Sequence, residues 1–364
     1  MINQFSLKKI ESRSNRLSEL IANDSINNQR PLILYGSGSW GVYYLNAMKD
    51  LFKDFVFCDG NPSKWGTTVE GIPVINPEEL KTNYRDCHIT ITSLDYYDEI
   101  YQQIKDFQLQ ERLVMALEGF RDDQLKDYYN LIIENYEYFA KTYDVLSDEL
   151  SQDIFYDRLN CCISGNHEYL LPLRSKTSQY FDPNIISLSE EEIFIDGGAY
   201  TGDTVLEFLK QTNGMFKQIY SFEPEESKYK DYFEISSKHD NIQLLNYGLW
   251  SKKDVLRFNA VNDGSSGVSE NGIVEIPVIS IDELLDGKPV TFIKMDIEGA
   301  ELEALKGAQE IIKKYKPKLA ICVYHKPLDI VEIPLFLKRL VPEYKIYLRH
   351  YNISMYETVC YAVV

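Results

Sequence analysis

The sequence predicts an α/β protein with two doubly wound units, each a mostly parallel sheet with helices on its faces. Two stretches of the chain alternate short apolar strands with helical segments, a pattern typical of parallel sheets. In each stretch the first strand leads into a glycine-rich turn that opens a helix, at residues 36–41 and 197–202. A chain of 364 residues also exceeds one ordinary core, which favours more than one domain.

Residues 31–118 are expected to form the first, smaller Rossmann-like α/β domain, after an N-terminal helix at residues 1–30. Its strands are expected at the apolar runs 31–35, 55–58, 71–75, 88–92 and 113–115. The turn Gly36-Ser-Gly-Ser-Trp-Gly41 and the acid Asp59 are spaced as in a nucleotide-binding βαβ unit. A glycine motif of this kind does not by itself identify a ligand.

Residues 119–188 are rich in Tyr, Leu, Asp and Glu, so we expect a helical connector there. Residues 189–364 form the second α/β domain. Its seven strands are expected near Ile193, Ile219, Ile242, Val290, Leu319, Tyr344 and Val359. Helices separate the first five strands, which predicts a doubly wound sheet. The last two strands follow each other closely enough to pair as an antiparallel ribbon at the sheet edge.

Composition and charge narrow the class of protein. No apolar run approaches the roughly 18 to 20 residues that span a bilayer, and the start of the chain lacks the apolar stretch of a signal peptide. Six scattered cysteines without CxxC spacing indicate neither a zinc site nor a disulfide framework. A net charge of −18 would repel nucleic acid at long range. We therefore expect a cytoplasmic protein with no membrane span and no nucleic-acid partner.

Three strands of the second domain are expected to end in acids. Asp196 precedes the glycine turn; the turn has no following lysine, which argues against a triphosphate loop, and an acid there suits an ammonium group of a ligand. Glu223 lies about 20 residues further on, where an acid accepts hydrogen bonds from ribose hydroxyls. Asp296 ends a third apolar strand, followed by Glu298 and Glu301, two acids that could also serve only to stabilise a helix N-terminus.

These segments resemble the FkbM family of S-adenosylmethionine-dependent methyltransferases: Asp-Gly-Gly-Ala-Tyr-Thr-Gly at 196–202, Phe-Glu-Pro at 222–224 and Ile-Lys-Met-Asp-Ile-Glu-Gly-Ala-Glu at 293–301. The resemblance covers residues 189–364 and implies the seven-stranded class I methyltransferase fold. It also implies S-adenosylmethionine as cofactor and methyl transfer to an oxygen of sugars or natural products. The cofactor contacts it implies are Asp196, Gly198, Ala199, Tyr200, Thr201, Gly202, Glu223, Asn246 and Asp296.

His325 is the leading candidate for the catalytic base, with Asp296 as its catalytic companion. It follows the apolar strand 317–324, and an ordinary imidazole accepts a proton near neutral pH. The alternative is a hydrogen-bonded histidine at a strand end. A magnesium ion held by Asp296 and Glu298 would suit carboxylate ligands, although the sequence does not require one. Lys294 or Lys326 is available to steer an anionic acceptor, such as a nucleotide-linked sugar.

The first domain resembles the small Rossmann-like domains that precede sugar acyltransferase modules and bind nucleotide sugars, through the 36–41 turn, Asp59 and residues 69–74. The main hypothesis is an O-methyltransferase that modifies a hydroxyl of a carbohydrate, a glycan precursor or a similar small molecule. One alternative is a non-catalytic protein that binds nucleotides or nucleotide sugars; a further one is an NAD-dependent oxidoreductase. The acceptor stays open, as does whether the chain forms a homo-oligomer.

Overall fold

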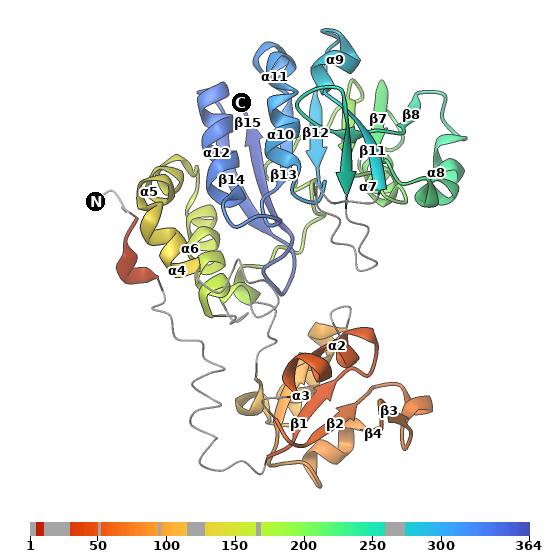
Figure 1. Cartoon of the computed structure of the whole chain (residues 1–364), viewed down its shortest axis with the longest axis vertical. Coiled ribbons are helices and arrows are strands. Elements are labelled where there is room, and N and C mark those ends of the chain that lie inside the picture. The colour runs from red at the N-terminus through yellow and green to blue at the C-terminus, as the bar shows by residue number, and fades with distance from the viewer. Residues whose placement is uncertain are drawn as a thin grey trace.

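The computed structural model describes residues 5–10, 30–49, 52–93, 96–114, 128–164, 169–258 and 274–364. Within them the chain forms two α/β units, the smaller one below the larger in Figure 1. The segment expected to be an N-terminal helix lies mostly outside the described residues. Of its described residues, 5–10 carry a short 3₁₀ turn, η1 (Leu7–Lys9).

The N-terminal unit is a five-stranded sheet in the order β3-β4-β2-β1-β5. Its elements are β1 (Leu32–Tyr35), α2 (Ser39–Met48), β2 (Phe55–Cys58), β3 (Thr68–Val69), β4 (Ile72–Ile75), β5 (His88–Ile91) and α3 (Tyr97–Asp106). All neighbours are parallel except β3, which is antiparallel to β4. Of the strand expected at 113–115, residue 115 lies outside the described residues. Leu113 forms an isolated parallel bridge with Ile89, and the N–H of Val114 donates to the carbonyl of Ile89 at 2.7 Å.

The second unit is built on a seven-stranded sheet in the order β14-β15-β13-β12-β6-β7-β8. Its strands are β6 (Ile193–Gly197), β7 (Gln218–Phe222), β8 (Ile242–Leu245), β12 (Phe292–Met295), β13 (Lys318–Cys322), β14 (Lys345–His350) and β15 (Thr358–Val363). The central strands are parallel, and β15 runs antiparallel between β13 and β14. The predicted doubly wound sheet and its antiparallel edge are confirmed.

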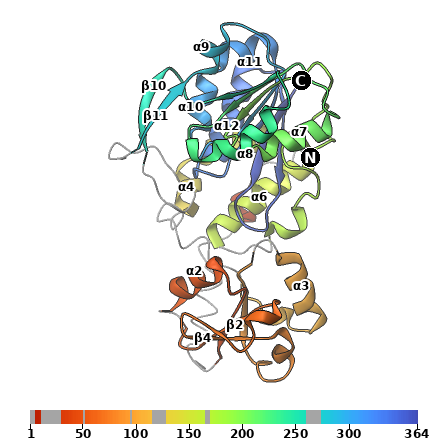
Figure 2. The same ribbon diagram turned by 90° about the vertical axis from the view of Figure 1, so that its right-hand side faces the viewer.

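Helices cover both faces of this sheet (Figures 1 and 2). They are α7 (Asp203–Gln211), α8 (Tyr229–Ser236), α9 (Ile281–Leu285), α10 (Glu301–Lys306), α11 (Gln309–Tyr315) and α12 (Asp329–Leu340). A second, three-stranded sheet lies between β8 and β12 in the chain. It consists of β9 (Gly248–Leu249), β10 (Asp254–Phe258) and β11 (Val274–Ile279).

The helices of the expected connector pack against the second unit. They are α4 (Tyr128–Glu134), α5 (Tyr136–Val145) and α6 (Glu149–Ser164), and α6 lies along β14 while α5 lies along α12. Their apolar side chains, such as Phe139 and Phe155, belong to the same core as Ile346 of β14. The backbone N–H of Leu348 donates to the hydroxyl of Ser151 at 2.9 Å. These helices therefore cover the open edge of the sheet, where unpaired backbone groups need partners.

The two units meet at the carboxyl ends of their strands (Figures 1 and 2). Ile353, in the loop between β14 and β15, shares an apolar cluster with Tyr97 and Ile100 of α3. Asp98, in the first turn of α3, forms an ion pair with Arg174, which precedes β6. Helix α3 follows β5, and the loop between β14 and β15 lies beside the end of β13. The edges at which doubly wound sheets bind ligands therefore face one another in the two units.

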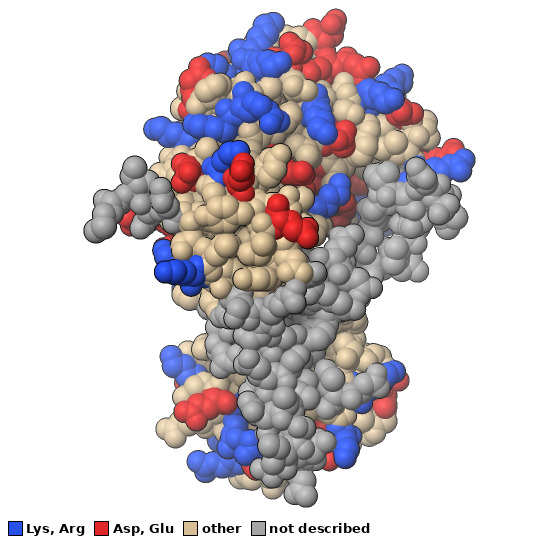
Figure 3. Space-filling model, turned by 60° about the vertical axis from the view of Figure 1, so that its left-hand side comes forward, with Lys and Arg blue, Asp and Glu red and all other residues tan. Residues whose placement is uncertain are grey.

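Acidic and basic side chains are interspersed on the face shown in Figure 3. The ion pairs Lys306–Glu303 and Lys313–Glu310, both three residues apart on a helix, show the same mixing. The described part of the chain holds no helix that is both long and apolar enough to cross a bilayer.

Candidate active site

The carboxyl ends of four adjacent strands form one rim of the larger sheet. In the strand register, Gly197 pairs with Met295 on one side and with Phe222 on the other, and Phe222 pairs with Leu245. The residues that directly follow these strand ends are Gly198, Asp296, Glu223 and Asn246. The structure thus brings the strand-end residues expected from the sequence to a single rim.

The glycine turn is required by close backbone packing. Gly198 has a φ of +76°, and a Cβ there would collide with the carbonyl oxygen of Asp296. Gly202 has a φ of +92° at the start of α7, where a Cβ would lie 2.5 Å from Ile235 Cδ1. The N–H groups of Gly198 and Ala199 donate to the carbonyl of Phe222 at 3.1 and 3.0 Å. Glycine therefore lets the backbone of the turn pack closely between the ends of β12 and β7.

Asp196 lies beneath this turn and is fully buried. Its Oδ1 is 3.1 Å from Nζ of Lys294, which also donates to the carbonyls of Gly197 and Gly198 at 3.1 and 2.9 Å. Burial raises the pKa of Asp196, and the charge of Lys294 partly offsets that effect. The carboxylate of Asp196, which was expected to face an ammonium group of the ligand, instead faces Lys294. It supports the turn through this lysine. Because Lys294 is buried in this role, it is not placed to steer an anionic acceptor.

Glu223 connects the glycine turn to the end of β7. Its Oε2 accepts from the N–H of Tyr200 at 3.0 Å, and its Oε1 accepts from the N–H of Glu225 at 2.8 Å. Burial raises its pKa, while these two N–H groups act in the opposite direction. Each carboxylate oxygen keeps a second lone pair, so both can accept a further hydrogen bond. Tyr200 is 53% exposed with Nζ of Lys228 4.1 Å above its ring, and Asn246 is exposed on the same rim.

Left-handed backbone conformations gather at this rim. Four of the nine described non-glycine residues with positive φ are Tyr180, Tyr200, Glu298 and Glu357. They come from four separate segments: before β6, after β6, after β12 and before β15. Such conformations cost energy for residues with a Cβ and concentrate at functional sites, where the surrounding structure enforces them. The rim is therefore the strongest candidate for an active site in the described part of the chain.

Asp296 is held by three donors. The hydroxyl of Tyr180 donates to Oδ2 at 2.8 Å, the hydroxyl of Tyr324 donates to Oδ1 at 3.0 Å, and Nε2 of His325 lies 3.4 Å from Oδ1. Burial opposes ionisation of Asp296, but the charges of Lys294 and His325 and the tyrosine hydroxyls outweigh it and lower the pKa. Asp296 is therefore a firmly ionised hydrogen-bond acceptor.

Sequence reasoning missed Tyr180, Tyr324 and Glu357. The carboxylate of Glu357 accepts from the side chain of Gln179 and from the hydroxyl of Tyr324, the latter at 3.3 Å. Tyr324 directly precedes His325, so its place next to the candidate base could have indicated it from the sequence. Tyr180 and Glu357 lie far from the rim in sequence, and no local pattern marks them.

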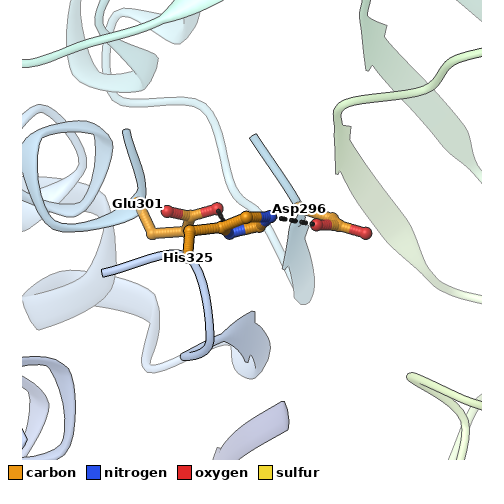
Figure 4. A group of neighbouring side chains, drawn as sticks. All are labelled: Asp296, Glu301 and His325. Carbon is orange, nitrogen blue, oxygen red and sulfur yellow. Dashed lines mark ion pairs between the residues drawn. The ribbon is translucent and has the colours of Figure 1, made fainter. Parts of the chain in front are cut away.

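The imidazole ring of His325 lies between two carboxylates (Figure 4). Its Nδ1 is 3.0 Å from Oε1 of Glu301, while its Nε2 is 3.4 Å from Asp296 and 3.7 Å from Oε2 of Glu298. Burial acts to lower the pKa of His325, but the charge and hydrogen bond of Glu301, with Asp296 and Glu298, raise it to about 9. The predicted base needs a neutral ring, whereas this environment favours the charged one.

The donor set at the rim does not fit magnesium. Donor atoms of Asp296, Glu301 and His325 lie within 4.8 Å of one another. Magnesium prefers an octahedron of oxygen ligands. Here the imidazole fills the space between the two carboxylates, with one ring nitrogen directed at each (Figure 4). Glu298, the other metal ligand considered from the sequence, reaches the same imidazole.

In the N-terminal unit, Asp59 is already engaged. Its Oδ2 accepts from the N–H and the hydroxyl of Ser37 at 3.1 and 2.5 Å and pairs with Nζ of Lys64 at 2.7 Å. Burial acts to raise the pKa of Asp59, but the bonds from Lys64 and Ser37 outweigh it and lower the pKa. Asp59, which is spaced like the ribose-binding acid of a nucleotide-binding βαβ unit, therefore accepts hydrogen bonds from Ser37 in the glycine turn.

Comparison with protein families separates the two units. The sequence of residues 196–345 matches the family described as methyltransferase FkbM domain. Residues 196–345 are a methyltransferase FkbM domain. The FkbM domain includes the glycine turn, Glu223, Asp296 and His325. The chain is accordingly an S-adenosylmethionine-dependent methyltransferase.

Residues 28–115 match the family described as C2185-like, N-terminal. The expected likeness of this unit to acyltransferase domains stays a prediction. None of the curated proteins matches the sequence of the chain.

One solved structure shares the fold along nearly the whole chain, and two others align with about half of it at low TM-scores. The crystal structure of methyltransferase FkbM from Methylobacillus flagellatus KT aligns over 97% of this chain and 94% of that chain, with a TM-score of 0.70 and 23% identity. Fibrillarin from Aeropyrum pernix with natively bound S-adenosyl-L-methionine aligns over 50% of this chain and 70% of that chain, with a TM-score of 0.32 and 13% identity. A methyltransferase from Streptococcus mutans in complex with SAH aligns over 50% and 92%, with a TM-score of 0.31 and 14% identity.

Proposed function

We propose that this methyltransferase transfers the methyl group of S-adenosylmethionine to a hydroxyl oxygen of a sugar, a glycan precursor or a similar small molecule in the cytoplasm. The observation that carries the proposal is the rim itself, where the glycine turn, Glu223 and Asp296 follow three adjacent strand ends. Ligands of doubly wound sheets bind at this edge. The sugar hydroxyl is taken from the resemblance of the rim segments to FkbM sequences.

The residues at the rim fit the cofactor. In the proposal Glu223 accepts from the ribose hydroxyls, for which its oxygens keep free lone pairs. The backbone of the 198–202 turn, with Ala199, Tyr200 and Thr201, is proposed to contact the amino-acid part, and Asn246 is proposed to contact the adenine. Asp196 supports the turn through Lys294. When bound, the cofactor supplies an electrophilic methyl group on a positively charged sulfur.

The catalytic end of the proposed site is formed by Asp296 and His325. Asp296 directly follows β12 beside the glycine turn, and the proposal has the transferred methyl group and the acceptor meet next to it. Held by Tyr180 and Tyr324, it can orient an acceptor hydroxyl for in-line attack. His325 keeps this carboxylate in place from the other side.

The N-terminal unit is proposed to bind the acceptor, with a nucleotide-linked sugar as the candidate. Trp40 in the first turn of α2 and Tyr96 just before α3 are 37% and 61% exposed. Both lie on the edge of this unit that is turned toward the methyltransferase rim. Aromatic faces of this kind suit stacking on sugar or base rings. The smaller unit would then present the acceptor to the larger one.

Calorimetric titration with S-adenosylmethionine tests the first half of the proposal, and we expect saturable binding. The second half needs methyl-labelled S-adenosylmethionine incubated with a panel of free sugars and nucleoside-diphosphate sugars. Mass spectrometry should show S-adenosylhomocysteine and a sugar that has gained one labelled methyl group. Binding of nucleotide sugars with no S-adenosylhomocysteine formed would instead support the non-catalytic alternative. An absorbance change with NAD would support the oxidoreductase.

A further inference from the structure

We infer that Glu298 is the general base of the methyl transfer, and that His325 is a charged positioning residue beside it. This inference rests on the proposed function and deepens it. It replaces the histidine base with Glu298, whose carboxylate lies next to the imidazole and is more open to an incoming acceptor, at 49% side-chain exposure against 24% for Asp296.

The surroundings of His325 leave no nitrogen to accept a proton. A neutral imidazole has one N–H donor and one acceptor nitrogen, whereas an imidazolium has two donors. Both nitrogens of His325 are directed at carboxylates, Nδ1 at Glu301 and Nε2 at Asp296 (Figure 4). Since ionised carboxylates only accept hydrogen bonds, the arrangement is satisfied when both nitrogens carry protons. His325 then binds its carboxylate neighbours together.

Glu298 has the position that a base needs. It lies two residues after Asp296 on the same loop, its side chain is 49% exposed, and its Oε2 is 3.7 Å from Nε2 of His325. Its backbone is left-handed at a φ of +54°, next to Gly299 at +89°. This turn directs Glu298 outward while Glu301, four residues from Ile297, folds back to accept the N–H of Ile297 at 2.8 Å.

The charges that face Glu298 come from every neighbouring element. Asp296 and Glu301 lie on its own loop and on α10, His325 and Lys326 follow β13, and Glu357 precedes β15. Burial, opposed by the charge of His325 and assisted by the three other acids, raises the pKa of Glu298 to about 7. A base with a pKa near the working pH combines a large ionised fraction with useful strength.

The step balances in atoms and charge. The Glu298 carboxylate accepts the proton of the acceptor hydroxyl, and the oxygen forms a bond to the methyl carbon as the carbon–sulfur bond breaks. The electron pair of that bond stays on sulfur, so the sulfonium becomes a neutral thioether. One negative carboxylate and one positive sulfonium thus become a neutral carboxylic acid and a neutral thioether. Being half exposed, Glu298 returns its proton to water.

A titration that needs no acceptor tests the assignment. In the full-length protein labelled with ¹³C at glutamate carboxyl and histidine Cε1 positions, the signal missing from Glu298→Gln should titrate near pH 7. The signal missing from His325→Gln should remain that of an imidazolium until about pH 9. An ordinary glutamate titration at Glu298, or loss of the His325 proton near pH 6.5, would overturn the inference.

Kinetics with the acceptor found in the sugar panel provide the second test. Glu298→Gln should lower kcat by about 10² to 10⁴-fold and abolish the acid limb of its pH profile, with cofactor affinity unchanged. His325→Gln removes a cation next to Glu298, so it should shift that limb to higher pH and leave it present. Glu303→Gln, a matched change at an ion pair with Lys306, should behave as wild type.

The two proposals fail in different ways. If the wild-type protein does not bind S-adenosylmethionine, the proposed function fails whatever Glu298 does. If wild-type protein methylates a sugar and Glu298→Gln keeps both its kcat and its acid limb, only the assignment of the base fails. Loss of the limb in His325→Gln alone would restore the histidine as base.

Discussion

At the scale of single residues, the rim shows that residue type alone does not set chemical role. Asp196, Asp296 and Glu298 are all acids near strand ends, yet one is buried against Lys294, one accepts from two tyrosines, and one is half exposed. Burial and neighbouring charge push their pKa values in different directions. The different roles of these three acids therefore follow from the different surroundings of their carboxyl groups.

The ion pairs of His325 should make the stability of the protein depend on pH. Its folded pKa of about 9 exceeds the ordinary 6.5, so the charged ring stabilises the fold fully below pH 6.5, and this is lost as pH rises through about 9. The loss is on the order of 3 kcal/mol in the free energy of unfolding. Denaturant unfolding of wild type and His325→Gln at about pH 7 and about pH 9.5 measures it. A gap between the two proteins that does not narrow at the higher pH would contradict the assignment.

Glu223→Ala should weaken binding of S-adenosylmethionine because it removes the proposed acceptor of both ribose hydroxyls. We expect an increase in Kd of about 10 to 100-fold, since a hydrogen bond to a charged group contributes roughly 1.5 to 3 kcal/mol. Calorimetry measures the affinity directly. His325→Ala is the comparison: it should leave Kd unchanged and slow turnover. Equal affinity in Glu223→Ala and wild type would remove the ribose assignment.

At the scale of elements, the strand–turn–helix from β6 to α7 is the part of the site that local sequence determines most fully. A buried strand, three glycines and a polar helix start are all visible in residues 193–204. Local sequence does not show that the turn contacts the ends of both neighbouring strands. Its N–H groups donate to the carbonyl of Phe222, and Gly198 packs against the carbonyl of Asp296. Those contacts depend on strand order, which is set by the whole sheet.

Gly198→Ala should disrupt both the turn and the end of β12. The new Cβ would collide with the Asp296 carbonyl, and an alanine resists the positive φ of this position. We expect a loss of stability of about 1 to 3 kcal/mol and loss of S-adenosylmethionine binding. Thermal unfolding and calorimetry measure the two effects. Gly60→Ala is the control, because a Cβ there meets open space; a Gly198→Ala protein that binds the cofactor normally would count against the proposed turn contact.

At the scale of the whole molecule, the second unit is completed by segments from outside its sheet. Residues 5–10 lie against α5 and α6, where Phe5 is 4% exposed and its ring lies 5.3 Å from that of Tyr156 and 6.0 Å from that of Phe155. The N–H of Ser6 donates to the hydroxyl of Tyr156 at 2.7 Å. The chain start therefore covers the helices that in turn cover β14.

Phe5→Ala should destabilise the protein by about 3 to 5 kcal/mol, the cost of removing a buried aromatic ring from a packed cluster. The free energy of unfolding from denaturant titration measures this loss. Cofactor affinity at low temperature should be unchanged, since Phe5 lies in the helical layer and not at the rim. Tyr138→Ala, at a residue that is 56% exposed, should cost far less. Similar losses for both variants would show that residues 5–10 do not pack on the helices.

The amino-acid sequence alone determined the two α/β units, the seven strands of the larger sheet and the strand-end residues Gly198, Glu223 and Asp296, because strand and helix periodicity and glycine turns are local properties. Only the tertiary structure decided that Tyr180 and Glu357 reach the rim, that Asp196 is buried beneath it, and that His325 lies between two carboxylates. Proton affinity depends on burial and on charges a few ångströms away, and those distances arise from packing between segments far apart in the chain.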